Sequence, residues 1–469
     1  MHMSQHRRAV AVNAHTTFRG KVRTAGILGK VRTAAILVGI ITATLIVADL
    51  LCNLFGVFPP NYEYGDLDVG WLAAKQTANV RDDRCVEPSG KVVQYVRNED
   101  GIRTNLSVPH LLADHGSFKI AVTGDSQTDL CAPNSQVHSG ILESELNANG
   151  LRAIVLPYGV GRYSPLQDYL VFKKLLKKYA PDALLLNFYT GNDFYDLLRV
   201  DDRPHFVESN GRYQIAEPVW YRYEDPRVQR RSRVLFVFRA LADATGVRNL
   251  VVHLQLLYQT AAEQGAGFRA VAGYLGDLRK SVEPTVGYRE AFTAQFLNQQ
   301  LFFHWFPGAR QQSMRRVRAL MELARTENPN TVLILSALPS YELVQQRPLD
   351  SALLRTLDRL PITYQGGVRE EQELYDALRQ LADEEGWLFV DNLTPLRGYQ
   401  GGDRLYNNID YHLLPIASTI IGKNQAAVLL RYLRWHRTPS GPPAHVTGMR
   451  ARQGRCWCWP RAARGWPCT

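Results

Sequence analysis

The chain has 469 residues, of which 45% are apolar, with 55 Lys and Arg against 44 Asp and Glu. This composition excludes an intrinsically disordered protein, and the length suffices for two ordinary domains or one large one. Twelve basic side chains lie in two acid-free terminal segments, 1–32 and 438–469, so residues 33–437 carry a formal net charge of −1. Because a nucleic-acid-binding domain concentrates positive charge on its folded part, we expect no nucleic-acid partner.

A mostly apolar stretch of 26 residues, 33–58, follows the basic amino-terminal segment. As a helix it would be roughly 39 Å long, enough to cross a hydrocarbon layer of about 30 Å. The positive flank predicts a cytoplasmic segment 1–32, a transmembrane anchor at 33–58 and an exported remainder. A buried core helix is the alternative, which the acid-free flank disfavours. No suitably spaced small residues mark a cleavage site, so we expect an uncleaved signal-anchor and a single-pass protein of the cell membrane.

The cysteines divide unevenly between the body and the ends of the chain. Only Cys85 and Cys131 fall in the predicted folded body. On the exported (periplasmic or extracytoplasmic) side they could form a disulfide, although sequence does not show whether they lie close enough. The last segment, 438–469, is rich in Arg, Pro, Gly and Trp and has no regular period. We expect it to be a disordered tail or an out-of-register remnant of the reading frame.

Short apolar strands alternate with amphipathic helices in the body, after a turn-rich extension at 59–110 that holds short β-like runs. The expected strands are 118–123, 151–156, 183–188, 331–338 and 387–391, and the expected helices are 138–149, 166–179, 310–326, 368–385 and 415–434. This alternation predicts an α/β fold with a doubly wound, mostly parallel sheet and helices on both faces. Ligands bind such sheets at the carboxyl ends of the strands.

The alternation is interrupted at about 200–305 by a segment with aromatic runs and an apolar helix candidate at 233–258. We interpret this segment as an insertion that caps the site or packs on the membrane surface, because long excursions often carry function.

Three polar clusters follow strands or precede the last helix. A serine at 126, in Gly-Asp-Ser-Gln-Thr, follows the first strand, where a sharp turn into a helix would expose its hydroxyl. An asparagine at 192, in Thr-Gly-Asn-Asp, follows the third strand and could donate to an oxyanion. Asp410 and His412 precede the last helix, and an aspartate can fix the tautomer of a catalytic histidine. Each cluster alone is more often an ordinary loop, but together they can project to one edge of the sheet.

Four blocks of the sequence resemble those of the SGNH (GDSL-like) hydrolase family over roughly 111–437, apart from the insertion. They read GDSQT (124–128), YGVGRYSP (158–165), TGNDFYD (190–196) and IDYHLLP (409–415). Upstream, DLDVGW (66–71) and NEDGIR (98–103) resemble the extension of exported, membrane-anchored members. The resemblance implies an SGNH/flavodoxin-like sheet in a hydrolase domain spanning 111–437.

The resemblance also implies roles for individual residues. Ser126 would be the nucleophile, His412 the general base and Asp410 the residue that orients it. The oxyanion donors would be the Ser126 backbone N–H, a second-block N–H and the Asn192 side chain. The family more often has Asp-x-x-His, whereas here one residue separates the pair. In the second block Arg162 stands where a glycine is expected, so we take Gly161 as the donor and keep Arg162 open.

The sequence therefore predicts a membrane-anchored serine esterase or deacylase that hydrolyses acyl esters, with acetyl esters as one candidate, of a small molecule or an envelope glycan. The alternatives are an O-acyltransferase that modifies a polysaccharide and a non-catalytic envelope scaffold. Intact Ser126, Asn192 and His412 argue against the scaffold. No metal-ligand spacing and no nucleotide fingerprint occurs, so we expect neither a metal nor a cofactor, and the sequence names no protein partner.

Overall fold

The computed structural model describes most of the body of the chain. It covers residues 63–73, 80–86, 92–200, 203–218, 267–281, 301–347, 351–407 and 411–437, with isolated positions at 36, 39–40, 43–44, 47, 254, 258, 297 and 299–300. The predicted cytoplasmic segment, the tail and the helix candidate at 233–258 lie outside these residues or are represented by isolated positions.

A five-stranded sheet forms the centre of the molecule. Its strands are β5 (Phe118–Gly124), β6 (Ala153–Gly159), β7 (Ala183–Tyr189), β10 (Val332–Leu338) and β11 (Leu388–Asp391). The order is β11-β10-β7-β5-β6, and every neighbouring pair is parallel. These strands are apolar runs because both faces of the sheet are covered. The predicted parallel sheet is confirmed, with each strand within three residues of its expected bounds.

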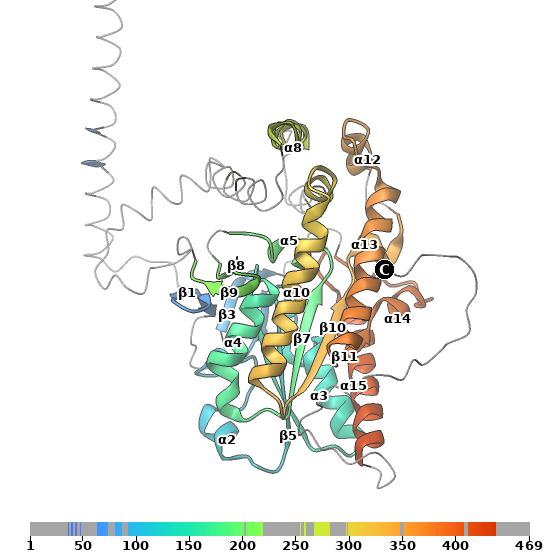
Figure 1. Cartoon of the computed structure of the whole chain (residues 1–469). Helices are drawn as coiled ribbons and strands as arrows, with labels where there is room; N and C mark the ends of the chain where they lie inside the picture. Colours follow the sequence, from blue (N-terminus) through green and yellow to red (C-terminus); the bar gives the residue numbers. More distant parts are fainter. Residues whose placement is uncertain are drawn as a thin grey trace, which may run out of the picture.

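Helices cover both faces of this sheet (Figure 1). On one face, α3 (His138–Ala148) and α15 (Pro415–Arg437) pack against Ile120, Val122 and their neighbours. On the other face, α4 (Pro165–Val171), α10 (Gly308–Glu327) and α13 (Tyr364–Glu384) share a core cluster with Ala121. Adjacent residues of β5 thus enter opposite cores, as strand geometry requires. The doubly wound arrangement is therefore as predicted.

The chain order of the sheet reverses between β5 and β7, because β6 lies outside β5 while β7 lies on its other side. Ligands of open α/β sheets bind at such a switch point, beyond the carboxyl ends of the strands. The loops that follow β5 and β7 hold Ser126 and Asn192, so the topology places both residues at this point.

One predicted helix differs from the expected single element. Instead of continuous α-helix over 166–179, α4 ends at Val171 and is followed by a π-helical turn, η2 (Phe172–Leu176), and a 3-10 turn, η3 (Lys177–Tyr179). Ala180 then adopts a left-handed conformation with φ 50. Pro181 disfavours the right-handed helical conformation in the residue before it, so the helix cannot continue.

The amino-terminal extension forms hairpins that pack on the loops of the sheet. Its elements are β1 (Glu63–Asp66), β2 (Gly70–Ala73), β3 (Val80–Val86), β4 (Val92–Tyr95) and α2 (Val108–Ala113). Trp71 is fully buried and meets the Tyr163 ring edge-on at 5.5 Å between centroids, while the Tyr163 hydroxyl donates to the Trp71 carbonyl. Gln167 Nε2 donates to the Val69 carbonyl at 2.7 Å. The DLDVGW segment is thus fastened to the second block.

Two buried arginines of the extension reach the loop after β5. Arg97 forms an ion pair with Asp129 at 2.6 Å, and Arg103 Nη1 donates to the Leu130 carbonyl at 2.7 Å. The Arg103 backbone N–H also donates to the Pro157 carbonyl of β6 at 2.9 Å. The extension therefore supports the carboxyl ends of β5 and β6.

The described part of the insertion and its surroundings lie mainly beyond the carboxyl ends of the strands, where α8 and α12 stand in Figure 1. The described elements of the insertion are β8 (His205–Ser209), β9 (Arg212–Ala216) and α8 (Phe268–Ser281). The surrounding short elements are η1 (Asn134–Gln136), α5 (Asp193–Asp196), α11 (Tyr341–Gln345), α12 (Ser351–Leu357) and α14 (Leu393–Arg397). The Tyr274 ring of α8 lies 5.8 Å from those of Phe302 and Phe306. Part of the insertion is thereby joined to the main core.

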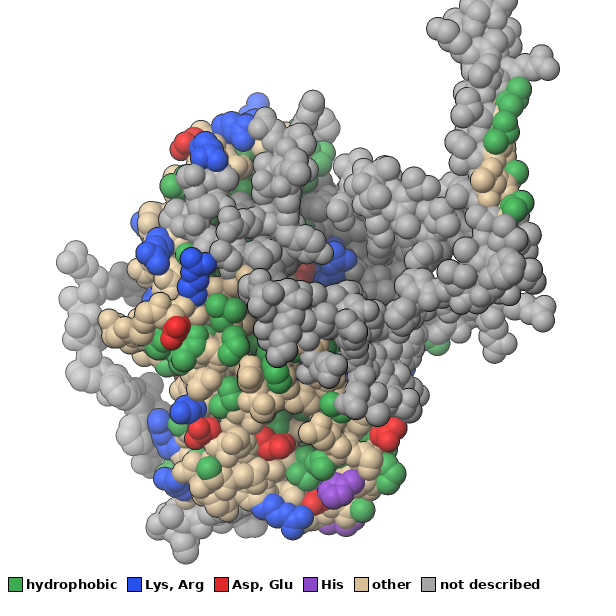
Figure 2. All heavy atoms as spheres, turned by 180° about the vertical axis from the view of Figure 1, so that it is seen from behind, with side chains coloured by type: hydrophobic (Ala, Val, Ile, Leu, Met, Phe, Trp, Pro, Cys, Tyr) green, Lys and Arg blue, Asp and Glu red, His purple; other side chains and the backbone are tan. Residues whose placement is uncertain are grey.

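The described surface mixes charges of both signs. Figure 2 shows basic and acidic side chains interspersed on the back of the molecule rather than separated by sign. Among the described residues, no helix has the length and apolar character needed to cross a membrane. The predicted anchor at 33–58 is represented there by a few isolated positions, so it stays a prediction.

Candidate active site

The turn that carries Ser126 begins where β5 ends. The Asp125 carbonyl accepts from the Thr128 N–H at 3.1 Å, and Asp125 Oδ1 accepts from the Gln127 N–H at 2.8 Å. Ser126 is half-buried on this turn. The expected helix does not follow directly, because further turns and η1 come before α3. Local side-chain and backbone hydrogen bonds, rather than a helix terminus, hold the serine.

Close packing against neighbouring strands fixes the same turn. A Cβ at Gly124 would overlap the Thr128 hydroxyl, and a Cβ at Gly159 would lie 2.6 Å from the Asp129 nitrogen. Asn187 of β7 donates from Nδ2 to the Thr128 hydroxyl at 3.0 Å. Glycine at these two positions therefore lets the turn sit directly on the ends of β6 and β7.

The loop that carries His412 is held against this turn by Gln127. Gln127 Nε2 donates to the Tyr411 carbonyl at 3.3 Å, and its Oε1 accepts from the Leu413 N–H at 3.1 Å. These bonds flank His412 on both sides, although 286 positions separate Gln127 from Leu413. The structure thus brings the predicted nucleophile and the predicted base to adjacent backbone segments.

The His412 loop is also closed on itself. The Asn407 N–H donates to the His412 carbonyl at 2.8 Å, and the Tyr411 N–H donates to the Asn407 carbonyl at 3.1 Å. Tyr411 has φ 56, in the left-handed region. His412 is half-buried and its Nε2 is shielded from solvent. Asp410, its predicted orienting partner, lies outside the described residues.

The second block turns in a left-handed conformation at Arg162, with φ 69. Gly161 has no such φ, and a Cβ built on it would meet nothing within 4 Å. The conformation that favours glycine therefore falls on the residue that replaces the expected glycine. Whether Gly161 or Arg162 supplies the oxyanion N–H stays a prediction.

Asn192 caps the amino terminus of the short helix α5. Its Nδ2 donates to Asp196 Oδ2 at 2.8 Å, and Arg203 Nη1 donates to Asp196 Oδ1 at 2.7 Å. Because an amide nitrogen carries two hydrogens, this bond leaves a second donor on Asn192. The Asp196–Arg203 pair, buried on both sides, holds the amide at the carboxyl end of β7, beside β5.

Four buried carboxyl groups surround the two loops: Asp125, Asp168, Asp193 and Asp196, each at most 4% exposed. Burial raises the pKa of Asp125 to about 6, although the Gln127 N–H and His412 lower it. Burial, with Asp125 adding to it, raises the pKa of both Asp168 and Asp193 well above the usual range. An ionised Asp125 beside His412 would stabilise the imidazolium form.

A second acidic pair lies behind the Asn192 loop. Glu371 accepts from the Thr190 hydroxyl at 2.5 Å and from the Ser340 hydroxyl at 2.8 Å. Glu342 lies near it, and burial together with Glu371 raises the pKa of Glu342 to about 8. Thr190 begins the third block, so this pair supports the loop that presents Asn192.

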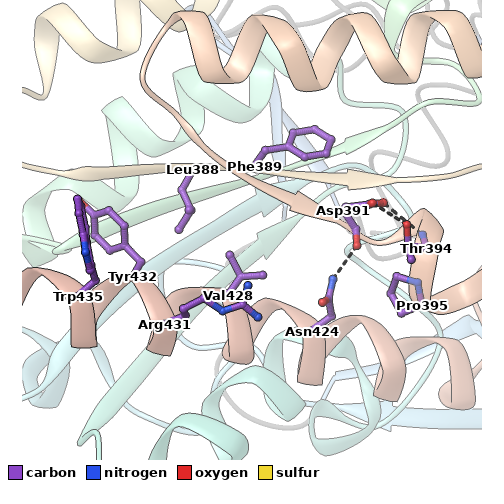
Figure 3. Close-up of a pocket in the computed structure, with 10 residues that line it drawn as sticks. All are labelled: Leu388, Phe389, Asp391, Thr394, Pro395, Asn424, Val428, Arg431, Tyr432 and Trp435. Atoms are coloured by element: carbon purple, nitrogen blue, oxygen red, sulfur yellow. Dashed lines mark hydrogen bonds between the residues drawn. The ribbon is translucent and has the colours of Figure 1, made fainter. Parts of the chain in front are cut away.

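A surface groove of about 710 Å³ lies elsewhere, between edge strand β11 and helix α15 (Figure 3). It is lined by Leu388, Phe389, Asp391, Thr394, Pro395, Asn424, Val428, Arg431, Tyr432 and Trp435. Its carboxyl group, Asp391, already accepts hydrogen bonds from Tyr375 and Thr394 and pairs with Arg379. None of the predicted site residues lines this groove. In the described part of the chain, no cluster of His, Cys, Asp and Glu is arranged to hold a metal ion.

Sequence reasoning missed the residues that join the site together. Gln127 stands next to the predicted nucleophile, but nothing in GDSQT shows that its partners lie near position 412. Asp168 offered a signal, because it is an acidic residue within a mostly apolar helix start, PLQDYLV. All seven of these residues are buried, so the carboxyl group lies among other side chains rather than in solvent.

No protein-family model matches the chain, and no curated protein matches it. Among solved structures, a lipase/acylhydrolase from Enterococcus faecalis is 13% identical, covers 69% of this chain and 99% of its own, and has a TM-score of 0.31. An acetylxylan esterase from Geobacillus stearothermophilus is 11% identical, covers 67% of this chain and 94% of its own, and has a TM-score of 0.31. An α/β hydrolase from the Lake Arreo metagenome is 12% identical, covers 68% and 97%, and has a TM-score of 0.30. Similarity at this level decides neither fold nor activity.

Proposed function

We propose that this chain is a serine hydrolase of carboxylic esters, with Ser126 as nucleophile, His412 as general base and Asp410 as the residue that orients His412. One observation carries the proposal: the two hydrogen bonds of Gln127 that flank His412 and tie its loop to the Ser126 turn. The switch-point position of the Ser126 and Asn192 loops supports it further, because ligands of such sheets bind there.

The proposed reaction is acyl transfer in two steps. The Ser126 hydroxyl adds to the ester carbonyl while His412 Nε2 takes its proton, and the resulting oxyanion accepts hydrogen bonds from Asn192 Nδ2 and backbone N–H groups. His412 then returns the proton to the departing alcohol, which leaves an acyl-enzyme. Water then adds to the acyl carbonyl as His412 takes its proton, and His412 returns that proton to the Ser126 oxygen as the acid leaves. The ionised Asp125 would stabilise the imidazolium that forms in both steps.

We also propose that the protein is anchored in the cell membrane through 33–58 and that the catalytic domain lies on the exported side. The acid-free basic flank supports this orientation. Cys131 is disulfide-bonded, and disulfides persist in oxidising compartments, which supports export. A reporter fused after Pro60 should be active only on the outer side of the membrane, and cytoplasmic activity would contradict the orientation.

The activity is tested with full-length protein in detergent, a fluorophosphonate probe and p-nitrophenyl acetate. Wild type should be labelled and should release p-nitrophenol, whereas Ser126→Ala should lose both. Ser117→Ala is the matched control, because Ser117 lies at the opposite end of β5 and hydrogen-bonds only near the surface, to Asp114. It should keep wild-type rates.

The outcomes separate the candidate functions. Turnover that needs an added sugar acceptor would indicate an acyltransferase, and a wild type that is never labelled would indicate a scaffold. Wild-type turnover in Ser126→Ala would end the assignment of the nucleophile.

A further inference from the structure

The backbone of Gln127 is fixed from two sides. Its N–H donates to Asp125 Oδ1 at 2.8 Å, and its carbonyl lies 3.2 Å from Nε2 of His138, a fully buried residue of α3. Burial lowers the pKa of His138 to about 4, so the ring is neutral at pH 7 and donates this bond from Nε2. Gln127 is itself 2% exposed. The residue that follows Ser126 therefore has little freedom to move.

The side chain of Gln127 hydrogen-bonds to the backbone of the His412 loop. Its amide nitrogen donates to the Tyr411 carbonyl and its amide oxygen accepts from the Leu413 N–H. A neutral amide offers a donor and an acceptor side by side in this way, whereas a carboxylate offers acceptors alone. Without it, a buried carbonyl and a buried N–H on either side of His412 would lose their partners, which proteins rarely tolerate.

We infer that Gln127 is a positioning residue that sets the distance between the Ser126 hydroxyl and the His412 imidazole. The inference rests on the proposed function and deepens it. A general base must lie within about 2.6–3.2 Å of the proton that it removes, and a displacement of about 1 Å can cost 10²-fold in rate. The His412 loop lies far from the Ser126 turn in the chain, and Gln127 contacts it directly on both sides of the histidine.

The test measures the rate of fluorophosphonate labelling at Ser126 in the full-length protein, together with kcat and KM for p-nitrophenyl acetate. Gln127→Met keeps the size of the side chain and removes both hydrogen bonds. We expect labelling and kcat to fall by about 10- to 100-fold with KM little changed, since the acyl group itself is not contacted.

Gln127→Glu supplies a readout that a merely structural role would not give. A protonated glutamic acid can donate to the Tyr411 carbonyl and accept from the Leu413 N–H, whereas an ionised one cannot donate. The ratio of Gln127→Glu activity to wild type should therefore fall as the pH rises from 5 to 8. The corresponding ratio for Gln127→Met should stay flat.

Asn328→Leu is the matched structural control. Asn328 is buried at the end of α10, beside the amino ends of the strands, and its Nδ2 makes two hydrogen bonds, to the Tyr169 hydroxyl and the Ala324 carbonyl. It should lose thermal stability yet label at the wild-type rate. Folding of each variant is followed by circular dichroism, and if Gln127→Met does not fold, the pH ratio of Gln127→Glu decides.

The outcomes distinguish this inference from the function on which it rests. A wild type that is not labelled would overturn both. If wild type is labelled and folded Gln127→Met is labelled at a rate within twofold of wild type, the inference alone is overturned. An equal loss in Asn328→Leu, or a flat Gln127→Glu ratio, would also overturn it.

Discussion

The carboxyl ends of β5 and β7 and the groove beside β11 differ in the chemistry they present. The groove has an accessible volume and aromatic walls, but its acid, Asp391, is neutralised by Arg379 and by hydroxyl donors. The β5–β7 edge gathers a serine, a histidine and buried carboxyl groups, including Asp125. Convergent polar groups with pKa values shifted by burial are typical of reactive sites, and we therefore propose the site at the carboxyl ends of β5 and β7 rather than in the groove.

The carboxyl groups of the two regions also have pKa shifts of opposite sign. Burial raises the pKa of Asp125 to about 6. At Asp391 burial acts in the same direction, but hydrogen bonds from Thr394 and Tyr375 outweigh it and lower the pKa. At neutral pH a carboxyl group whose pKa is raised by burial lowers the free energy of unfolding, whereas a hydrogen-bonded carboxylate whose pKa is lowered increases it.

The largest effect should come from His412→Ala at the β5–β7 edge. We expect kcat to fall by about 10⁴- to 10⁶-fold, because Ser126 would have no base. The double variant Ser126→Ala/His412→Ala should be little slower than either single variant, since members of a triad act as a unit. Steady-state kinetics of all three variants check this, and additive losses would contradict a shared site.

Asn192→Ala should cause the next largest loss. Removal of one oxyanion donor should lower kcat by about 10²–10³-fold with a smaller effect on KM. Asn192→Asp is the informative companion, because it keeps the size of the side chain, removes the donor and adds charge next to Asp196. If Asn192→Ala retained the wild-type kcat, the amide would serve only to hydrogen-bond Asp196.

Asp125→Asn and Asp391→Asn should change stability with opposite signs. Since the pKa of Asp125 in the folded protein lies above its unfolded value of about 3.9, wild-type stability falls as the pH rises from about 4 to 6. The free energy of unfolding of Asp125→Asn minus that of wild type should be about 1–3 kcal/mol larger at pH 8 than at pH 3.5. Urea unfolding at both pH values measures this difference.

Asp391→Asn should be less stable than wild type at pH 7, because the lowered pKa means that the folded protein favours the carboxylate. The difference should shrink as the pH falls through that lowered pKa. The same sign of change in both variants would refute the contrast between the two regions.

The smallest effect should come from the groove itself. Trp435 lies at its rim and is 59% exposed. Trp435→Ala should change kcat/KM for p-nitrophenyl acetate by less than about twofold, because the groove contains none of the proposed catalytic groups. A loss comparable to that of Asn192→Ala would move the active site to the groove.

Much of the fold could be predicted because its signals are local. Apolar runs such as ALLLNFY (183–189) specify strands buried on both faces, and their alternation with helices specifies a parallel sheet. The end of the second helix is also a local signal, since Ala180 comes before Pro181, and the expected helix ends at Tyr179. The π-helical turn within it was not predicted.

The contacts within the site could not be predicted in the same way. Gln127 meets residues 411 and 413 only because the sheet brings the loop after β5 beside the segment before α15. Arg97 and Arg103 of the extension reach Asp129 and Leu130 for the same reason. No periodicity encodes such partners, so the sequence predicts candidate reactive residues but not the residues that hold them.

The most direct test of the account is to identify the residue that a fluorophosphonate modifies in the full-length wild-type protein. Peptide mass spectrometry should find one adduct, on Ser126, formed at a rate that falls as His412 becomes protonated at low pH. An adduct on a different serine, or a rate that His412→Ala leaves unchanged, would contradict the proposed pairing of Ser126 with His412.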